Sequence, residues 1–175
     1  MSAHTSVLRL SVLLLAAAIA PAFAAQDFSI GAPLEQDGMR IAARFVSGVE
    51  TDRMPGGRDK DSVLLEADIH ATAAETHGFP DGAWMPYLEV QYVLTKDGDR
   101  TYKKGGLLFP MAAHGGPHYG GDVGLAGPGT YRLTFIISPP ASHGMLRHVD
   151  KATGVAAWWK PFPVNWTFTY PGKPE

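Results

Sequence analysis

Apolar and polar residues alternate along six stretches of the chain, and this alternation predicts short β-strands. The clearest case is residues 162–170, where Phe162, Val164, Trp166, Phe168 and Tyr170 occupy every second position. A period of two places neighbouring side chains on opposite faces of a strand. The predicted strands span residues 39–46, 62–72, 87–95, 100–108, 130–137 and 162–170.

Turn signals and irregular segments separate these stretches. Residues 36–38 and 96–99 carry the Asp-Gly pairs typical of tight turns, and residues 141–160 form a long connection without a clear period. After the N-terminal segment the chain shows neither a helical period of several turns nor a repeat of 20–50 residues. The sequence therefore predicts an all-β fold, an immunoglobulin-like antiparallel β-sandwich, with residues 25–175 as a single domain.

Residues 1–24 are typical of a secretory signal peptide. Arg9 supplies a positive charge, an apolar run follows from Leu10 to Ala20, and small residues stand at Ala22 and Ala24. The apolar run is short for a transmembrane helix. We therefore expect an exported protein, and a periplasmic location follows from the family resemblance described below.

Composition excludes several classes of function. The chain has no cysteine, which rules out disulfides, thiolate metal sites and thiol nucleophiles. It carries 15 Lys and Arg against 17 Asp and Glu, and loss of Arg9 with the signal peptide leaves 14 against 17, a charge of −3. Without a basic stripe, no nucleic-acid partner is expected. No nucleophile–base motif or phosphate-binding loop occurs, so we do not predict an enzyme.

A segment rich in glycine and proline, residues 108–120, carries Met111, His114 and His118. Its composition predicts a loop. A thioether combined with imidazoles suits copper better than magnesium or calcium, and histidines without cysteine could also bind zinc. The alternative is a surface loop in which the methionine packs into the core and both histidines face solvent.

A second candidate segment is the strand predicted at residues 62–72. Its alternation places Leu64, Glu66, Asp68 and His70 on the face opposite the expected core. This face is either exposed to solvent or forms a polar wall beside a metal or a subunit interface. A third segment contains His143, Met145 and His148, so five of the six histidines after residue 24 lie in or beside these three segments.

Several longer motifs follow one another in a fixed order along the chain. They are LEADIHA at 65–71, FPM at 109–111, GPHYG at 116–120, RHVD at 147–150 and GVAAWWKPF at 154–162. Together they closely resemble the periplasmic iron-transport accessory proteins, the copper-binding FetP-like family. The likeness runs from about Ile30 to Tyr170. It implies an immunoglobulin-like homodimer that binds copper near its dimer interface and serves an inner-membrane iron permease.

The resemblance also implies a ligand set. By motif, Met111, His118 and His148 match copper ligands of the family, and Glu66 matches a carboxylate beside the metal. The family has a histidine where this chain has Leu64, and an aspartate where it has Gly115. His114, next to the missing aspartate, is a candidate substitute ligand. His70, His143 and Met145 are lesser candidates.

The resulting functional prediction is a periplasmic copper-binding protein that assists high-affinity iron uptake. Thioether and imidazole ligands support both copper oxidation states, and the harder carboxylates of Glu66 and Asp68 could hold iron nearby. Two alternatives remain open: a copper carrier or copper-resistance protein without an iron role, and a module that binds a host protein. A ferroxidase or reductase activity has no support in the sequence.

Overall fold

The protein is described from a computed structural model, which covers residues 26–52 and 62–172. The strands are β1 (Gln26–Ser29), β2 (Leu34–Gln36), β3 (Met39–Ser47), β4 (Ser62–Ala71), β5 (Glu89–Lys96), β6 (Asp99–Ala113), β7 (Gly116–Gly124), β8 (Gly129–Ser138) and β9 (Phe162–Tyr170). A short 3₁₀ helix, η1, spans Pro140–His143. The all-β prediction and all six predicted strands are confirmed. The predicted signal peptide, residues 1–24, lies outside the described residues.

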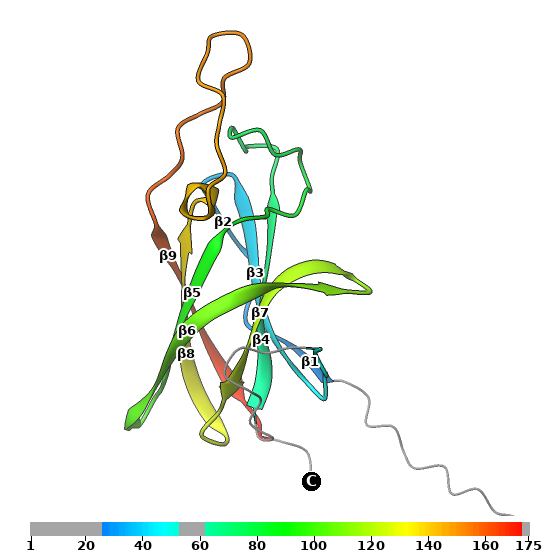
Figure 1. Cartoon of the computed structure of the whole chain (residues 1–175). Helices are drawn as coiled ribbons and strands as arrows, with labels where there is room; N and C mark the ends of the chain where they lie inside the picture. Colours follow the sequence, from blue (N-terminus) through cyan, green and yellow to red (C-terminus); the bar gives the residue numbers. More distant parts are fainter. Residues whose placement is uncertain (1–25, 53–61, 173–175) are drawn as a thin grey trace, which may run out of the picture.

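Every pair of neighbouring strands is antiparallel. Hydrogen bonding links the strands in the order β1-β3-β4-β7-β6-β5-β8-β9, and β2 pairs with β3. The long strand β6 pairs with β5 as far as Leu108 and with β7 from Phe109 onward, so it belongs to both halves of a curled sheet (Figure 1). Because this pairing is continuous through β6, it does not confirm an immunoglobulin type of sandwich, which stays a prediction.

The inner face of the curled sheet holds one apolar core. Phe45 on β3 contacts residues of β9, with ring centroids 5.8 Å from Phe168 and 5.4 Å from Tyr170. Alternate residues of β9 are buried, as the sequence predicted, and Trp166 also donates a 3.0 Å hydrogen bond from Nε1 to the carbonyl of Ala32. Burying each large apolar side chain contributes about 1.5–3 kcal/mol, so this core stabilises the curl of the sheet.

Strand β4 is buried on both faces for most of its length. Val63, Leu65 and Ala67 belong to the core, whereas Leu64 and Glu66 point away from it and are still buried. Strand β7 pairs with β4 from Ser62 to Ala67, which places the β6–β7 hairpin beside this second face. The predicted polar face of β4 is therefore partly a buried wall.

The prediction of a loop at residues 108–120 is wrong. The segment is a β-hairpin in which Met111 pairs with His118 and Ala113 pairs with Gly116. Its prolines and glycines favour a loop locally, but β7 also pairs with β4, and this tertiary context overrides the local preference. Only His114 and Gly115 form the turn, and the glycines elsewhere in the segment lie within strands.

Tyr119 fixes β7 to the body of the protein. Its hydroxyl donates to the carbonyl of Met85 at 2.7 Å and accepts from the amide of Leu88 at 3.0 Å. Burial raises the pKa of Tyr119 to about 12. Because Tyr119 points into the core, the side chain of its neighbour His118 faces the opposite side of the strand.

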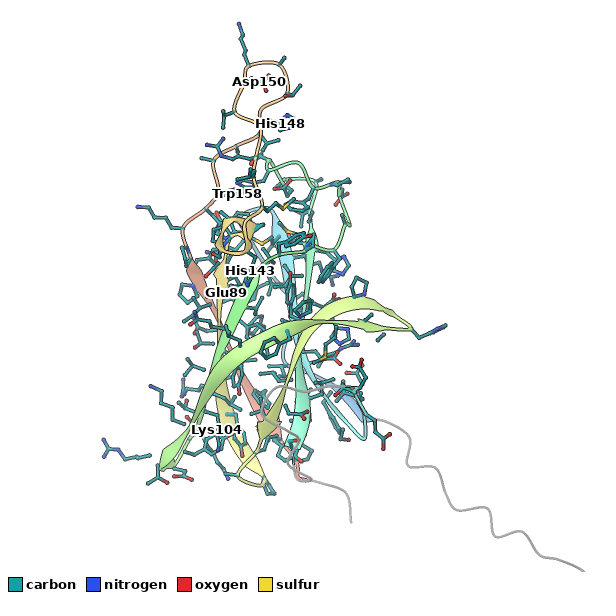
Figure 2. All side chains as sticks on the ribbon, in the orientation of Figure 1. Glu89, Lys104, His143, His148, Asp150 and Trp158 are labelled. Atoms are coloured by element: carbon teal, nitrogen blue, oxygen red, sulfur yellow. The ribbon has the colours of Figure 1, made fainter. Side chains whose placement is uncertain are left out.

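The connection between β8 and β9 is irregular apart from η1, as predicted. It projects beyond the end of the sheet, and Figure 2 shows Trp158, His148 and Asp150 along it, with the last two at its outer end. Among the described residues, no helix is long and apolar enough to cross a membrane.

Candidate metal site

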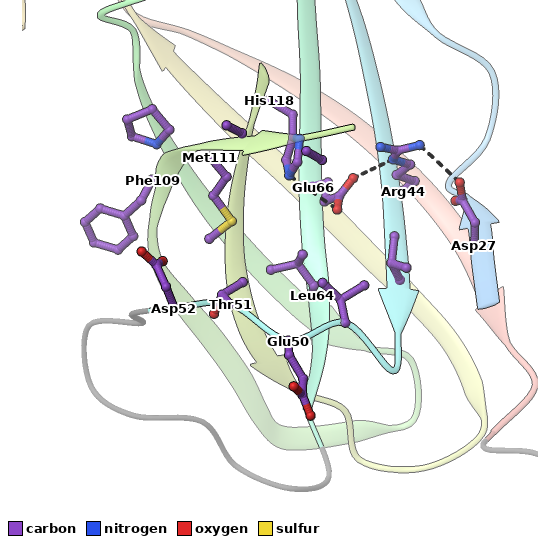
Figure 3. A pocket seen from close by; sticks show the side chains of 15 residues that line it. Asp27, Arg44, Glu50, Thr51, Asp52, Leu64, Glu66, Phe109, Met111 and His118 are labelled. Carbon is purple, nitrogen blue, oxygen red and sulfur yellow. Dashed lines mark hydrogen bonds and ion pairs between the residues drawn. The ribbon is translucent and has the colours of Figure 1, made fainter. Parts of the chain in front are cut away.

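Four neighbouring strands bring the candidate ligands onto one face of the sheet. Glu66 pairs with Arg44 on β3 and with Gly120 on β7, and Met111 on β6 pairs with His118 on β7. Every second residue of a strand shares a face, so Glu66, His118 and Met111 point to the same side. These side chains line an open cleft of about 780 Å³ (Figure 3).

The sulfur of Met111 occupies space that a glycine leaves open. A Cβ on Gly120 would come within 2.8 Å of Sδ and 3.4 Å of Cδ1 of Leu64. The thioether therefore lies over a bare stretch of β7, beside the strand that carries Glu66. Sequence analysis did not single out Gly120, because its importance depends on strand register.

The side chain of His118 is buried and carries a nitrogen without a partner. The residue is 6% exposed, and Nε2 has no hydrogen-bond partner among the described residues. It lies 3.4 Å from Oε1 of Glu66, close enough for an ion pair but outside hydrogen-bond geometry. Leaving a buried polar group unpaired costs about 1–3 kcal/mol, so such a group calls for an explanation. A metal ligand role fits this nitrogen and its neighbouring thioether.

Arg44 holds the buried carboxylate of Glu66 in place. Its Nε donates to Oε2 of Glu66 at 2.5 Å, and its Nη1 donates to Asp27 at 3.1 Å. Partial burial would lower the pKa of Arg44, but the hydrogen bond and charge of Glu66 raise it above its ordinary value. Since Arg44 engages Oε2, the other oxygen of Glu66 remains on the His118 side.

The described lining of the cleft is acidic. Among the residues that the structure describes, it contains the carboxylates of Asp27, Glu50, Asp52 and Glu66 and the guanidinium of Arg44. A cleft lined by one sign of charge concentrates ions of the opposite sign. The electrostatics therefore favour entry of a cation toward Met111 and His118.

Of the other positions considered for the metal site, Leu64 lies in the cleft and His114 lies on the surface. Leu64, where the family resemblance implies a histidine, is buried and lines the cleft. His114 is exposed in the hairpin turn and is not part of the cleft lining. In residues 26–52 and 62–172, no group of three or more histidine or carboxylate side chains could hold a metal within one chain. Within the cleft, His118, Glu66 and the thioether of Met111 are the predicted donors, and their ligand roles stay predictions.

His148 lies apart from the cleft. It is exposed near the outer end of the β8–β9 connection, whereas Met111 and His118 lie on the β6–β7 hairpin (Figures 2 and 3). Leu146 and Val149 beside it are 90% and 76% exposed. One chain therefore does not bring the third predicted ligand to the first two, and its role stays a prediction that requires a second chain.

Asp68 and His70, further along the same face of β4, form a separate polar pair. His70 Nε2 lies 2.8 Å from Oδ1 of Asp68, and its Nδ1 lies 2.8 Å from the carbonyl of Gly82. Asp68 and His70 line a different hollow from the one that contains His118. In η1, His143 Nδ1 lies 3.2 Å from the carbonyl of Tyr87.

His77 ties the β4–β5 connection to the β8–β9 connection and also forms an ion pair with Glu75 of its own connection. His77 Nδ1 donates to Oε1 of Glu75 at 2.6 Å, its Nε2 donates to the carbonyl of Ala157 at 3.1 Å, and its ring stacks on Trp158 at 5.5 Å. Burial would raise the pKa of Glu75, but hydrogen bonds from the amides of Phe79 and His77 and from the His77 ring lower it. The sequence analysis predicted no role for Glu75 or His77.

Comparison with known proteins identifies the family. The family described as Fe2+ transport protein matches residues 24–172. The chain belongs to this family. A protein of Brucella abortus is 41% identical over 175 residues, which cover 95% of each chain. The 34 kDa membrane antigen of Treponema pallidum is 33% identical over 148 residues, which cover 80% of this chain and 72% of the antigen.

Solved structures of family members have the same fold. FetP of uropathogenic Escherichia coli matches with a TM-score of 0.79 and 39% identity, over 85% of this chain and 99% of FetP. Copper-reconstituted P19 of Campylobacter jejuni matches with a TM-score of 0.79 and 42% identity, over 86% of this chain and 99% of P19. The predicted resemblance is confirmed, and it supports a metal-related role within an iron-transport family.

Proposed function

We propose that the chain is a periplasmic copper-binding protein that assists high-affinity iron uptake through an inner-membrane iron permease. The observation that carries the proposal is the buried Nε2 of His118, which has no hydrogen-bond partner among the described residues, next to the thioether of Met111 in an acidic cleft. The iron-transport family supports the iron role, copper-bound neighbours support copper, and expression of FetP in the periplasm supports the location.

The donor atoms of the cleft suit copper in particular. Met111 and His118 would hold the ion, Glu66 would lie beside it, and His114, exposed in the turn of the hairpin, remains a further candidate. Thioether and imidazole ligands accept both Cu(I) and Cu(II), so bound copper would supply one-electron redox chemistry. Oxygen ligands suit iron, the proposed transported or second metal, and the acidic lining favours its approach. We propose binding rather than catalytic turnover.

We propose further that the working unit is a homodimer in which the second copy supplies His148. The imidazole lies on a projecting tip whose two apolar neighbours, Leu146 and Val149, are almost fully exposed. Apolar groups exposed in this way are stabilised when a partner covers them. The cleft near Met111 has apolar lining from Phe109 and Pro110 that could receive such a tip.

Copper titration of purified variants tests the ligand assignment. Met111→Leu and His118→Gln are expected to lower copper affinity at least tenfold, because each removes a donor atom of the cleft. His114→Gln is expected to have a smaller effect, since His114 does not line the cleft. His143→Gln is a matched control, because His143 does not line the cleft and its Nδ1 instead lies against the carbonyl of Tyr87. Unchanged affinity in Met111→Leu and His118→Gln would contradict the proposal.

Mixed dimers test whether the site is shared between two chains. Dimers of His118→Gln alone and of His148→Gln alone should each bind copper weakly. Refolding the two variants together should restore one complete site in each mixed dimer, and copper binding should reappear. If mixing restores nothing, the shared site is wrong. Iron uptake by cells that carry these variants, compared with their copper sensitivity, separates an iron-uptake role from a copper-resistance role.

A further inference from the structure

The tip that carries His148 is a closed turn. The amide of Val155 donates to the carbonyl of His148 at 3.1 Å, and the amide of Gly154 donates to the carbonyl of Asp150 at 2.9 Å. A Cβ on Gly154 would come within 2.3 Å of that carbonyl oxygen, so the turn requires glycine at this position. Although it projects into solvent, the tip therefore has a defined backbone.

The carboxylate of Asp150 organises the interior of this turn. Oδ1 accepts from the amides of Ala152 and Thr153, each at 2.9 Å. Oδ2 accepts the hydroxyl proton of Thr153 at 2.6 Å. Aspartate commonly accepts amide protons two and three residues further on, so the backbone bonds alone are an ordinary turn feature. The hydroxyl bond is the additional feature.

The hydrogen bonds of Thr153 determine which ring nitrogen of His148 carries a proton. Its Nδ1 lies 2.8 Å from Oγ1 of Thr153. A hydroxyl has one proton, and that of Thr153 is already donated to Asp150, so Oγ1 can act only as an acceptor toward the imidazole. Nδ1 must therefore carry a proton and donate it. In the neutral ring, the other nitrogen, Nε2, is then left with a free lone pair.

We propose that Thr153 and Asp150 are positioning residues that hold His148 in the Nδ1–H tautomer and present Nε2 as a metal donor. This inference rests on the proposed function for the ligand role of His148. Histidines that bind metals usually donate their other nitrogen to an oxygen acceptor, which fixes the ring and its tautomer. Here the acceptor is a threonine hydroxyl, which is itself oriented by a carboxylate two residues from the histidine.

The hydrogen bonds to Thr153 and Asp150 would restrict the rotation of an otherwise exposed histidine. A histidine on a projecting tip would otherwise rotate freely and sample both neutral tautomers, and binding would have to overcome that entropy. The relay from Asp150 through Thr153 to His148 lies entirely within six residues. It therefore travels with the tip and can preorganise the imidazole before a second chain arrives.

Tautomer measurement on the metal-free protein tests the relay directly. Long-range ¹H–¹⁵N correlation spectra, recorded where the ring is neutral, should show a protonated Nδ1 and an unprotonated Nε2 for His148. Thr153→Val, which keeps the shape but removes the hydroxyl, should shift the population toward protonated Nε2. Thr153→Ser should restore the original pattern. Thr167→Val, at an exposed site on β9, is the matched control and should leave His148 unchanged.

Copper binding by the same variants tests the consequence. Thr153→Val is expected to lower copper affinity roughly 10–100-fold, the usual range for partners that orient a ligand, with recovery in Thr153→Ser. An unprotonated Nδ1 in the wild type, or a tautomer unaffected by Thr153→Val, would overturn the relay. If the tautomer shifts as expected but His148→Gln leaves copper affinity unchanged, the relay stands and the ligand role in the proposed function fails.

Discussion

The sulfur of Met111 lies where a side chain at position 120 would begin, 2.8 Å from the place of a Cβ on Gly120. Gly120→Ala should therefore displace the thioether and lower copper affinity about tenfold, because the geometry of a ligand depends on the groups that support it. We expect a modest loss of stability, about 1 kcal/mol, since the displaced atom lies in the outer part of a flexible side chain. Copper titration and thermal unfolding measure the two effects.

Gly124→Ala provides the control for this substitution. Gly124 lies on the same strand, and a Cβ there would meet nothing within 4 Å. It should change neither copper affinity nor stability appreciably. Equal effects of the two substitutions would mean that the contact between Met111 and Gly120 has no special role.

Removal of Arg44 should destabilise the protein through Glu66. Arg44→Met leaves the buried carboxylate, 4% exposed, without its guanidinium partner, and an unpaired buried group of this kind costs about 1–3 kcal/mol. Urea unfolding of the metal-free protein measures the loss. Adding Glu66→Leu to Arg44→Met should recover much of the stability, because the unpaired charge is then absent. Failure of the second change to recover stability would contradict this explanation.

Leu64→His should lower the stability of the metal-free protein and raise its copper affinity. The side chain is buried, so a histidine without a partner should destabilise the metal-free protein by about 1–3 kcal/mol. It also supplies the imidazole that the family resemblance implies at this position. Copper should then stabilise the variant more than it stabilises the wild type, since tighter binding to the folded state raises its stability. Thermal unfolding with and without copper measures both effects. Leu64→Gln should show the destabilisation without the added copper response.

Acid should weaken the contact between the β4–β5 and β8–β9 connections, which His77 and Glu75 support. The pKa of Glu75 is lowered in the folded protein, so its contribution is fully present above the ordinary carboxyl pKa and is lost as the pH falls through the lower, folded-state pKa. Glu75→Gln should therefore reduce stability at neutral pH and flatten its decline in acid. Urea unfolding across an acidic pH series measures this. Glu89→Gln, a carboxylate at the start of β5, is the control and should retain the wild-type decline.

Sequence reasoning succeeded where one strand contained the whole signal. The alternation from Phe162 to Tyr170 predicted β9 with its observed bounds, and the turn at residues 96–99 was also expected. The short edge strands β1 and β2 were missed, because three or four residues cannot establish a period. The β6–β7 hairpin was missed for a different reason, since its composition favours a loop and only pairing with β4 shows otherwise.

The candidate donors of the proposed site can be named from the sequence, whereas the residues that support them cannot. Met111, His118 and Glu66 are notable by residue type and by family motif. Arg44 and Gly120 matter because of their register with Glu66, and no local pattern gives the register between distant strands. For the same reason, sequence reasoning could group His148 with the other ligands by motif but could not place it on a tip apart from them.

The shared strand β6 has a consequence for how the fold responds to stress. Residues before Leu108 complete the hydrogen bonding of one half of the sheet, and residues from Phe109 onward complete that of the other. Neither half can open fully without releasing part of the same strand, so the hairpin that carries Met111 and His118 is mechanically and cooperatively linked to the core. Slow amide hydrogen exchange in β6 would then report on both regions at once, and a ligand held by the hairpin would stiffen the distant half of the sheet as well.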